Sequence, residues 1–197
     1  MVEFWESRYS DPAYAYGVQP NEFLRQELKK IPEGKILFPA EGEGRNAVYA
    51  ARKGFDVHAF DFSTEARRKA LALAEEQGVS IDYRTATYEN IEYSPDSFDV
   101  IVLVFAHMPP DKRTHWHRKL SGFLKQGGLI ILQGFSKEQM NYPSGGPRNV
   151  DMLFSKEELF GDFSGLEVLF MEQHVIPLDE GLYHKGDASV ISALFRK

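Results

Sequence analysis

The sequence predicts an open, doubly wound α/β fold, in which helices cover both faces of a mostly parallel sheet. Three observations lead to this prediction: short apolar runs recur along the chain, amphipathic segments separate them, and a glycine-rich turn follows the first run. Parallel strands covered on both faces are apolar throughout, and their alternation with helices is typical of α/β folds. For 197 residues we expect a single domain, 1–197.

The strands are predicted where apolar residues follow one another without a helical period. Such runs indicate buried strands, because a strand inside a parallel sheet is shielded from water on both faces. Five of them precede the last third of the chain, the third being the weakest: residues 36–38, 57–60, 81–83, 101–105 and 129–132.

Helices are predicted from capping residues that precede apolar residues at helical spacing. Asn21 and Ser63 each have a side-chain oxygen that can cap the first turn of a helix. Another helix opens at Asp111, directly after two prolines, and closes before the glycine pair 127–128. Ser155 and Glu158 have the spacing of a capping box.

The last third of the chain predicts a hairpin. Residues 166–176 and 189–195 have the composition of strands, and the link between them, roughly 177–188, shows no helical period. A parallel crossover needs about a dozen residues or more and normally contains a helix. The final strand should therefore run antiparallel to its predecessor.

The composition excludes several classes of protein. Apolar residues make up 43% and charged residues 26%, which is typical of a globular chain. The absence of cysteine excludes disulfides, thiolate metal sites and a cysteine nucleophile. No metal site is predicted, because His115 and His117 are two positions apart and would point to different faces of a helix.

Charge and hydropathy also limit the partners. The net charge is −6, and no cluster of lysine and arginine is long enough to follow a phosphate backbone, so neither nucleic acid nor a membrane is expected as a partner. The longest apolar run, 100–106, is far shorter than the roughly 20 residues of a membrane helix. No secretory signal is expected at the start, and the predicted location is the cytoplasm.

The turn after the first strand carries the strongest local signal. Gly42, Gly44 and Ala47 have the spacing of a nucleotide-binding loop, and Asp61 lies 19 positions after Gly42, at the end of the next strand. An acid at that place accepts hydrogen bonds from a ribose diol. A tight turn with a solvated aspartate would leave a similar pattern, but the loop, the acid and the order of elements together favour a ligand that contains adenosine.

The charge of the loop selects between adenosine ligands. Glu41 and Glu43 flank Gly42 where the next helix begins, and a dinucleotide would place its pyrophosphate there. Two carboxylates would repel a pyrophosphate, whereas they would attract the ammonium and sulfonium groups of S-adenosylmethionine. The sequence therefore favours S-adenosylmethionine over NAD.

These residues resemble the class I S-adenosylmethionine-dependent methyltransferases, nearest the small tellurite-resistance and thiopurine methyltransferase group. The resemblance covers nearly the whole chain and rests on Trp5, Arg8-Tyr9, Tyr16-Gly17, Pro20-Asn21, the loop 42–47, residues 61–63 and the turn 124–128. It implies a Rossmann-like sheet of seven strands whose last strand is antiparallel, with S-adenosylmethionine as the cofactor. Phe38, Ala40 and Thr87 depart from the group's pattern.

The resemblance and the loop together imply a set of cofactor-binding residues. They lie in the first twenty residues, in the glycine loop, and after the second, third and fourth strands. The set is Trp5, Tyr9, Tyr16, Glu41, Gly42, Glu43, Gly44, Arg45, Asn46, Asp61, Phe62, Ser63, Thr87, Tyr88, Phe105, Ala106 and His107. The aromatic residues of 1–20 suggest an arm that either covers the cofactor as a lid or anchors to the core.

Ligands in open α/β sheets bind beyond the carboxyl ends of the strands. His107 follows the fourth strand, so it could act as a general base, orient its loop or contact the cofactor. The long connection 136–154 is expected to be a substrate loop without clear secondary structure. Tyr142, Arg148 and His184 are candidates for the acceptor's side, although each also suits an ordinary surface position.

The predicted activity is in-line methyl transfer to a small-molecule acceptor, which the sequence does not identify, by a monomer or homodimer. Two alternatives stay open. An NAD-dependent oxidoreductase would share the loop spacing, and a non-catalytic S-adenosylmethionine-binding protein would use its aromatic arm for a partner.

Overall fold

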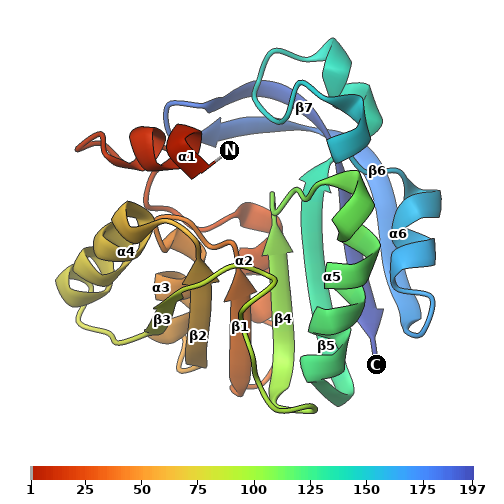
Figure 1. Cartoon of the computed structure of the whole chain (residues 1–197), viewed down its shortest axis with the longest axis horizontal. Coiled ribbons are helices and arrows are strands. Elements are labelled where there is room, and N and C mark those ends of the chain that lie inside the picture. Colours follow the sequence, from red (N-terminus) through yellow and green to blue (C-terminus); the bar gives the residue numbers. More distant parts are fainter. Residues whose placement is uncertain (1) are drawn as a thin grey trace. The chain divides into compact units, whose positions relative to one another are not determined.

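Seven strands form one mixed sheet in the computed structural model, which describes residues 2–197 (Figure 1). The strand order is β3-β2-β1-β4-β5-β7-β6. The chain divides into two compact units: the residues up to Glu92 with Glu180–Tyr183, and Tyr93–Asp179 with His184–Lys197. The single domain over 1–197 stays a prediction, and Met1, the start of the expected arm, lies outside the described residues.

The first unit contains three parallel strands and four helices. Its strands are β1 (Lys35–Pro39), β2 (Asp56–Asp61) and β3 (Asp82–Thr85). Its helices are α1 (Val2–Tyr9), α2 (Glu22–Leu28), α3 (Arg45–Arg52) and α4 (Thr64–Glu76). β2 pairs with both β1 and β3 in the parallel sense, so the carboxyl ends of all three strands lie at the same edge.

The caps that were predicted for two of these helices are confirmed. The Asn21 side chain accepts from Leu24 N at 3.0 Å at the start of α2, and Ser63 Oγ accepts from Ala66 N at 3.0 Å at the start of α4. Each bond satisfies an amide that has no partner inside its helix. α1 was not predicted, because its aromatic residues show no clear helical period.

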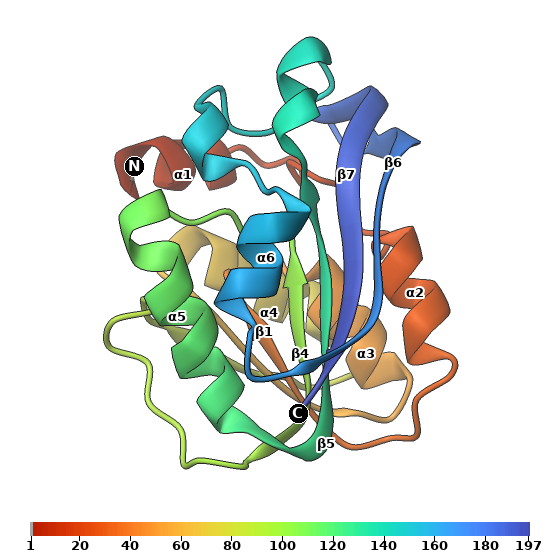
Figure 2. The same cartoon turned by 90° about the vertical axis from the view of Figure 1, so that its right-hand side faces the viewer.

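The second unit contains the other four strands. They are β4 (Phe98–Val104), β5 (Leu124–Phe135), β6 (Glu167–Glu180) and β7 (His184–Arg196). Its helices are α5 (Pro110–Phe123), α6 (Lys156–Asp162) and the short 3-10 helices η1 (Lys137–Asn141) and η2 (Val150–Met152). β5 is parallel to β4 and antiparallel to β7, and α5 and α6 lie side by side (Figure 2).

The predicted fold class is confirmed: the sheet is mostly parallel and its last strand is antiparallel. The capping box of α6 is confirmed as well, since Ser155 N donates to Glu158 Oε2 at 3.0 Å and Glu158 N donates to Ser155 Oγ at 3.2 Å. No helix within residues 2–197 combines the length and apolar character that a bilayer span requires.

Two expectations are wrong: the length of the link between the last two strands and the lack of secondary structure in 136–154, whereas α5 ends before the glycine pair, as predicted. The link between the last two strands is only 181–183, because β6 and β7 are both longer than expected. β6 is an edge strand, which is where a sheet tolerates a proline such as Pro177. The connection 136–154 contains η1 and η2, and α5 continues directly into β5, which includes the glycine pair.

Candidate functional site

The loop after β1 is the centre of the candidate site. Ala40 follows the strand with φ +50°, and Gly42 and Gly44 come next with φ +65° and +88°. A non-glycine residue in the left-handed region is strained, and such strain gathers at ligand-binding turns. Gly44 then serves as the N-cap position of α3, although it has no side chain to accept a hydrogen bond.

Glu41 supplies the cap that Gly44 lacks. One carboxylate oxygen, Oε1, accepts from Asn46 N at 2.9 Å and from Ala47 N at 2.8 Å, at the first turn of α3. Desolvation raises the pKa of Glu41 to about 7, against the lowering effect of these amides. The anion site that a helix N-terminus offers is therefore filled by the chain's own carboxyl group.

Asp61, at the end of β2, holds the same loop through hydrogen bonds. Its Oδ2 accepts from Gly42 N at 3.1 Å and its Oδ1 accepts from Ser63 N at 2.9 Å. Burial raises the pKa of Asp61 to about 6, despite these two hydrogen bonds. Each carboxylate oxygen has a further acceptor position, so Asp61 can hold the loop and still accept hydroxyl donors.

Glu43 has a cationic partner within the chain, and its expected contact with a cofactor stays a prediction. It forms a buried ion pair with Lys69 of α4, and its Oε2 accepts from Ala15 N at 2.7 Å. The Lys69 ammonium also donates to the carbonyl oxygens of Asp11 at 2.8 Å and Ala13 at 2.6 Å. The charge of Glu43 is thus matched by Lys69, and the structure favours a role in tying the N-terminal arm to the loop over direct attraction of a ligand.

The aromatic residues of the arm also reach the loop. Trp5 stacks on Tyr9 with ring centroids 5.5 Å apart, and a Cβ at Gly42 would lie 2.9 Å from the Tyr9 hydroxyl oxygen. Tyr83 donates to the Gly42 carbonyl oxygen at 2.6 Å. Gly42 is therefore enclosed by two phenol groups, and Tyr9, which is 6% exposed, covers it.

Arg8 links the arm to the tip of the hairpin. Its guanidinium donates to the Tyr16 hydroxyl at 2.9 Å and lies 4.0 Å from the centroid of the Tyr183 ring. Leu182 N donates to Ala15 O at 2.9 Å. These contacts hold the arm in place through both polar and cation–π interactions.

Arg45 and Asn46 anchor the start of α3. Arg45 donates to Glu180 Oε2 at 2.8 Å and to Gln19 O at 3.4 Å. Asn46 Oδ1 accepts from Asn21 N at 2.9 Å. Both side chains were expected to contact a cofactor, and both are used here to fix the segments that precede α2 and β7.

The segments after β2 and β3 lie within the same unit. Ser63 and Phe62 follow Asp61 directly, with Ser63 buried as the cap of α4 and Phe62 partly exposed. Thr87 accepts from Asn90 N at 3.4 Å in a turn, and the Tyr88 ring packs edge-on against Phe60 at 5.4 Å. Phe62 and Tyr88 are both partly exposed, so the contact of either ring with a cofactor stays a prediction.

His107 is in the second unit, after β4. Its Nδ1 lies 2.8 Å from Met152 O and its Nε2 lies 3.0 Å from Phe135 N. A carbonyl accepts and an amide donates, so Nδ1 carries the proton and Nε2 accepts. Burial lowers the pKa of His107 to about 4. With both nitrogens bonded, the geometry favours the role of orienting its loop over that of a general base.

Aromatic rings surround this histidine. Phe105, which has φ +52°, lies 4.6 Å from the Phe135 ring and 4.7 Å from the His184 ring. His107 stacks on Phe154 at 4.5 Å. His184 is 5% exposed and packs within this aromatic cluster. Its expected role on the acceptor's side stays a prediction.

Two of the remaining candidates, Tyr142 and Arg148, lie on the connection between η1 and η2. Arg148 is exposed and donates to the Tyr142 carbonyl oxygen at 3.1 Å, which closes a turn around the glycine pair 145–146. Ala106 is buried beside His107. Tyr142 and Arg148 are in contact, and their role toward an acceptor stays a prediction.

Sequence reasoning missed two residues of the site, Lys69 and Tyr83. Lys69 lies between Ala66 and Leu73 on the face of α4 that is otherwise apolar. A lysine in that position is a signal of a buried partner, because a charge rarely enters a core unpaired. Tyr83 had no such signal, since a tyrosine in a strand is ordinary.

Residues 36–128 match the family model of a methyltransferase domain. This match covers the glycine loop, Asp61 and His107. The family expected from the sequence is thereby confirmed for this part of the chain.

Curated relatives share the methyltransferase domain at low identity. The ubiquinone/menaquinone biosynthesis C-methyltransferase UbiE of Geotalea daltonii is 29% identical over 119 residues, which is 58% of this chain and 51% of that protein. The uncharacterised protein Rv1403c of Mycobacterium tuberculosis is 27% identical over 104 residues, 53% of this chain and 38% of that protein. The chain thus matches about half of these relatives or less.

Solved structures share the fold. A protein studied for the conversion of a disulfide bond into a thioacetal group during echinomycin biosynthesis has a TM-score of 0.82 at 16% identity, covering 100% of this chain and 91% of its own. TehB from Haemophilus influenzae has a TM-score of 0.74 at 18% identity, covering 100% of this chain and 66% of its own. At such identities the likeness establishes the Rossmann-like fold of the methyltransferase domain.

Proposed function

We propose that the protein transfers a methyl group from S-adenosylmethionine to a small-molecule acceptor. The observation that carries the proposal is the Glu41 carboxylate, which occupies the first-turn amides of α3. A dinucleotide would need those amides for its pyrophosphate and would meet the like charge of Glu41. A ligand with an ammonium group gains from the same carboxylate.

Asp61, Gly42 and the arm would hold this cofactor. Asp61 has acceptor positions left for ribose hydroxyls, and the positive φ of Gly42 forms the turn that Asp61 holds. Trp5 and Tyr9 present stacked rings beside the loop, and aromatic faces stabilise a cation. When bound, the cofactor supplies an electrophilic methyl group on a sulfonium.

The acceptor that suits this site is already deprotonated when it binds, so that its nucleophilic atom has a free lone pair. His107 holds its loop through both ring nitrogens, so it would have to break the bond from Phe135 N before it could take a proton. A thiolate or another soft anion needs no such base, and catalysis then rests on alignment of the reacting atoms. His107 is a positioning residue in this proposal.

The binding test is calorimetric titration with S-adenosylmethionine, with its demethylated product S-adenosylhomocysteine, and with NADH. We expect the first two to bind with dissociation constants below about 1 mM and NADH not to bind. NADH binding in the absence of S-adenosylmethionine binding would overturn the proposal in favour of an oxidoreductase. Binding without turnover across a panel of thiols, amines and oxyanions would favour a non-catalytic role.

A pair of aspartate variants locates the site. Asp61→Ala removes the acceptor at the loop, and we expect the affinity for S-adenosylhomocysteine to fall at least about tenfold, or 1.4 kcal/mol. Asp56→Ala is the control, because Asp56 begins the same strand and is exposed. Equal affinities in the two variants would place the cofactor elsewhere.

A further inference from the structure

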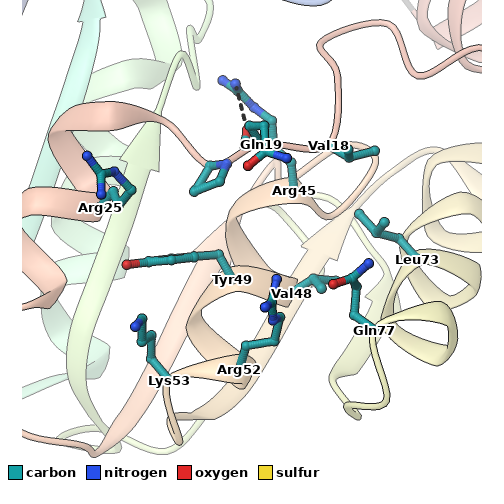
Figure 3. Close-up of a pocket in the computed structure, with 11 residues that line it drawn as sticks. Val18, Gln19, Arg25, Arg45, Val48, Tyr49, Arg52, Lys53, Leu73 and Gln77 are labelled. Carbon is teal, nitrogen blue, oxygen red and sulfur yellow. Dashed lines mark hydrogen bonds between the residues drawn. The ribbon is translucent and has the colours of Figure 1, made fainter.

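A pocket of about 240 Å³ opens among α2, α3 and α4 in the first unit (Figure 3). None of its lining residues is Glu41, Gly42 or Asp61. Arg45 lines it through its stem, but its guanidinium is turned to Gln19 O and to Glu180. The pocket is therefore a separate feature from the site around the glycine loop.

The lining of the pocket is partly polar and partly apolar, and its apolar part includes an aromatic ring. Val48 and Leu73 form part of its wall and are each 3% exposed, and Pro20 adds a further apolar surface. The Tyr49 ring extends from α3 toward the side of the pocket where Arg25 and Lys53 lie (Figure 3). These groups offer a flat apolar surface on which another planar group can stack.

The charges at the pocket have one sign. Four of its eleven lining residues are cationic and none is acidic, in a chain with a net charge of −6. Arg25 is held by Glu22 through two bonds of 2.7 Å. Within residues 2–197, Arg52 and Lys53 form no ion pair, and the Lys53 ammonium lies 5.7 Å from the centroid of the Tyr49 ring.

We propose that this pocket binds a small organic anion with a flat apolar body, of the class of aromatic carboxylates. The Arg52 guanidinium matches the planar fork of a carboxylate, and Lys53 adds a second cation at the same rim. The ring of the ligand would lie against Tyr49, Val48 and Leu73. The volume is below the roughly 300 Å³ at which pockets for drug-sized ligands begin, so a single-ring molecule suits it.

The test uses benzoate as the probe and the methyl resonances of Val48 and Leu73 as reporters in two-dimensional NMR. We expect both resonances to shift saturably with a dissociation constant of about 1 mM or tighter. Benzamide, which has the same shape without the charge, and inorganic phosphate, which has charge without the ring, should each bind at least about tenfold more weakly.

Matched double variants test whether Arg52 and Lys53, at the rim of the pocket, are responsible for benzoate binding. Arg52→Gln with Lys53→Gln should weaken benzoate binding at least about tenfold. Arg118→Gln with Lys156→Gln removes the same charge from exposed positions of the second unit and should leave it unchanged. The proposal would be overturned if the two double variants bound benzoate equally, or if no saturable shift were seen. It would also be overturned if benzamide or phosphate bound as tightly as benzoate. S-adenosylhomocysteine titration of the same variants reports separately on the site around the glycine loop.

Discussion

The roles of single residues at the glycine loop depend on contacts that their residue type alone did not predict. Glu41 and Glu43 were expected to act together as two negative charges, yet one caps α3 and the other pairs with Lys69. The difference comes from tertiary contacts: α4 carries a cation to Glu43, whereas Glu41 has backbone amides within reach. The spacing of the glycines and Asp61 was predictable because it depends on local backbone geometry, but partners far apart in the chain were not.

Gly42 provides a prediction at this scale. Its φ is +65° and a Cβ would lie 2.9 Å from the Tyr9 hydroxyl oxygen, while Gly78 has φ +68° and nothing within 4 Å. Gly78→Ala should lower the free energy of unfolding by about 1 kcal/mol, the cost of the left-handed backbone. Gly42→Ala should cost more than that and also weaken S-adenosylhomocysteine binding. Urea denaturation and calorimetry check both, and equal effects of the two substitutions would contradict the prediction.

Lys69 provides a second prediction at the scale of single residues. It is 4% exposed and its partner Glu43 is 5% exposed, so each single substitution leaves a buried charge unmatched. Lys69→Met should lower the free energy of unfolding by about 3 kcal/mol. The double variant Glu43→Gln with Lys69→Met should cost less than the sum of the two single changes, because no lone charge remains. A urea denaturation cycle measures this coupling, and simple additivity would argue against the ion pair.

Elements were predicted well where local signals agree with the fold. The runs that became β1, β2, β4 and β5 are apolar because both of their faces are covered. The caps at Asn21, Ser63 and Ser155 follow from side-chain chemistry that acts within one turn. The predicted strand 166–176 ends before β6 does, because an edge strand has an irregular apolar pattern and tolerates Pro177 and the exposed Val175. Its extension to Glu180 depends on pairing with β7, which the local sequence does not encode.

The packing of α5 against α6 gives a prediction for these elements. Asp162 of α6 accepts from Arg113 Nε at 2.8 Å and lies 2.9 Å from His117 Nδ1, both on α5. Asp162→Asn should lower the free energy of unfolding by about 3 kcal/mol, since the buried Arg113 loses its nearer carboxylate and keeps only the 3.7 Å contact with Glu158. Asp99→Asn, which breaks an exposed pair with Lys125, should cost less than about 1 kcal/mol. Urea denaturation at neutral pH compares them.

This interaction also has a defined pH dependence. Hydrogen bonds from His117, Thr114 and Arg113 outweigh burial and lower the pKa of Asp162 to about 2. A carboxyl with a lowered pKa stabilises the fold above its unfolded pKa of about 4 and loses that contribution as the pH falls toward 2. The difference between the wild type and Asp162→Asn should therefore shrink between about pH 4 and pH 2. A difference that stays constant over this range would exclude the carboxylate as its source.

For the molecule as a whole, the sequence was sufficient for the fold class and for the methyltransferase domain, because both depend on patterns repeated along the chain. It was not sufficient for the site, because the residues that enclose Gly42 come from α1 and β3, and the partner of Glu43 comes from α4. The same fold hosts many activities, so the acceptor has to be read from side chains rather than from topology.

The last prediction joins ligand binding to the stability of the whole chain. Burial raises the pKa of Glu41 to about 7 and that of Asp61 to about 6. Carboxyls with raised pKa values favour the ligand-free fold at low pH, and this contribution is lost as the pH rises from about 4 to about 7. A cationic cofactor requires the ionised forms, so its binding should strengthen over the same range.

The rise in melting temperature on adding S-adenosylmethionine should therefore grow between about pH 5.5 and pH 8. Glu41→Gln keeps an acceptor for the α3 amides but has no proton to lose, so the dependence should flatten in this variant. Differential scanning calorimetry of both proteins, with and without the cofactor, measures the effect. A shift that is independent of pH in the wild type would mean that neither carboxyl group meets the cofactor's positive charge, because a ligand cation beside either group must displace its proton.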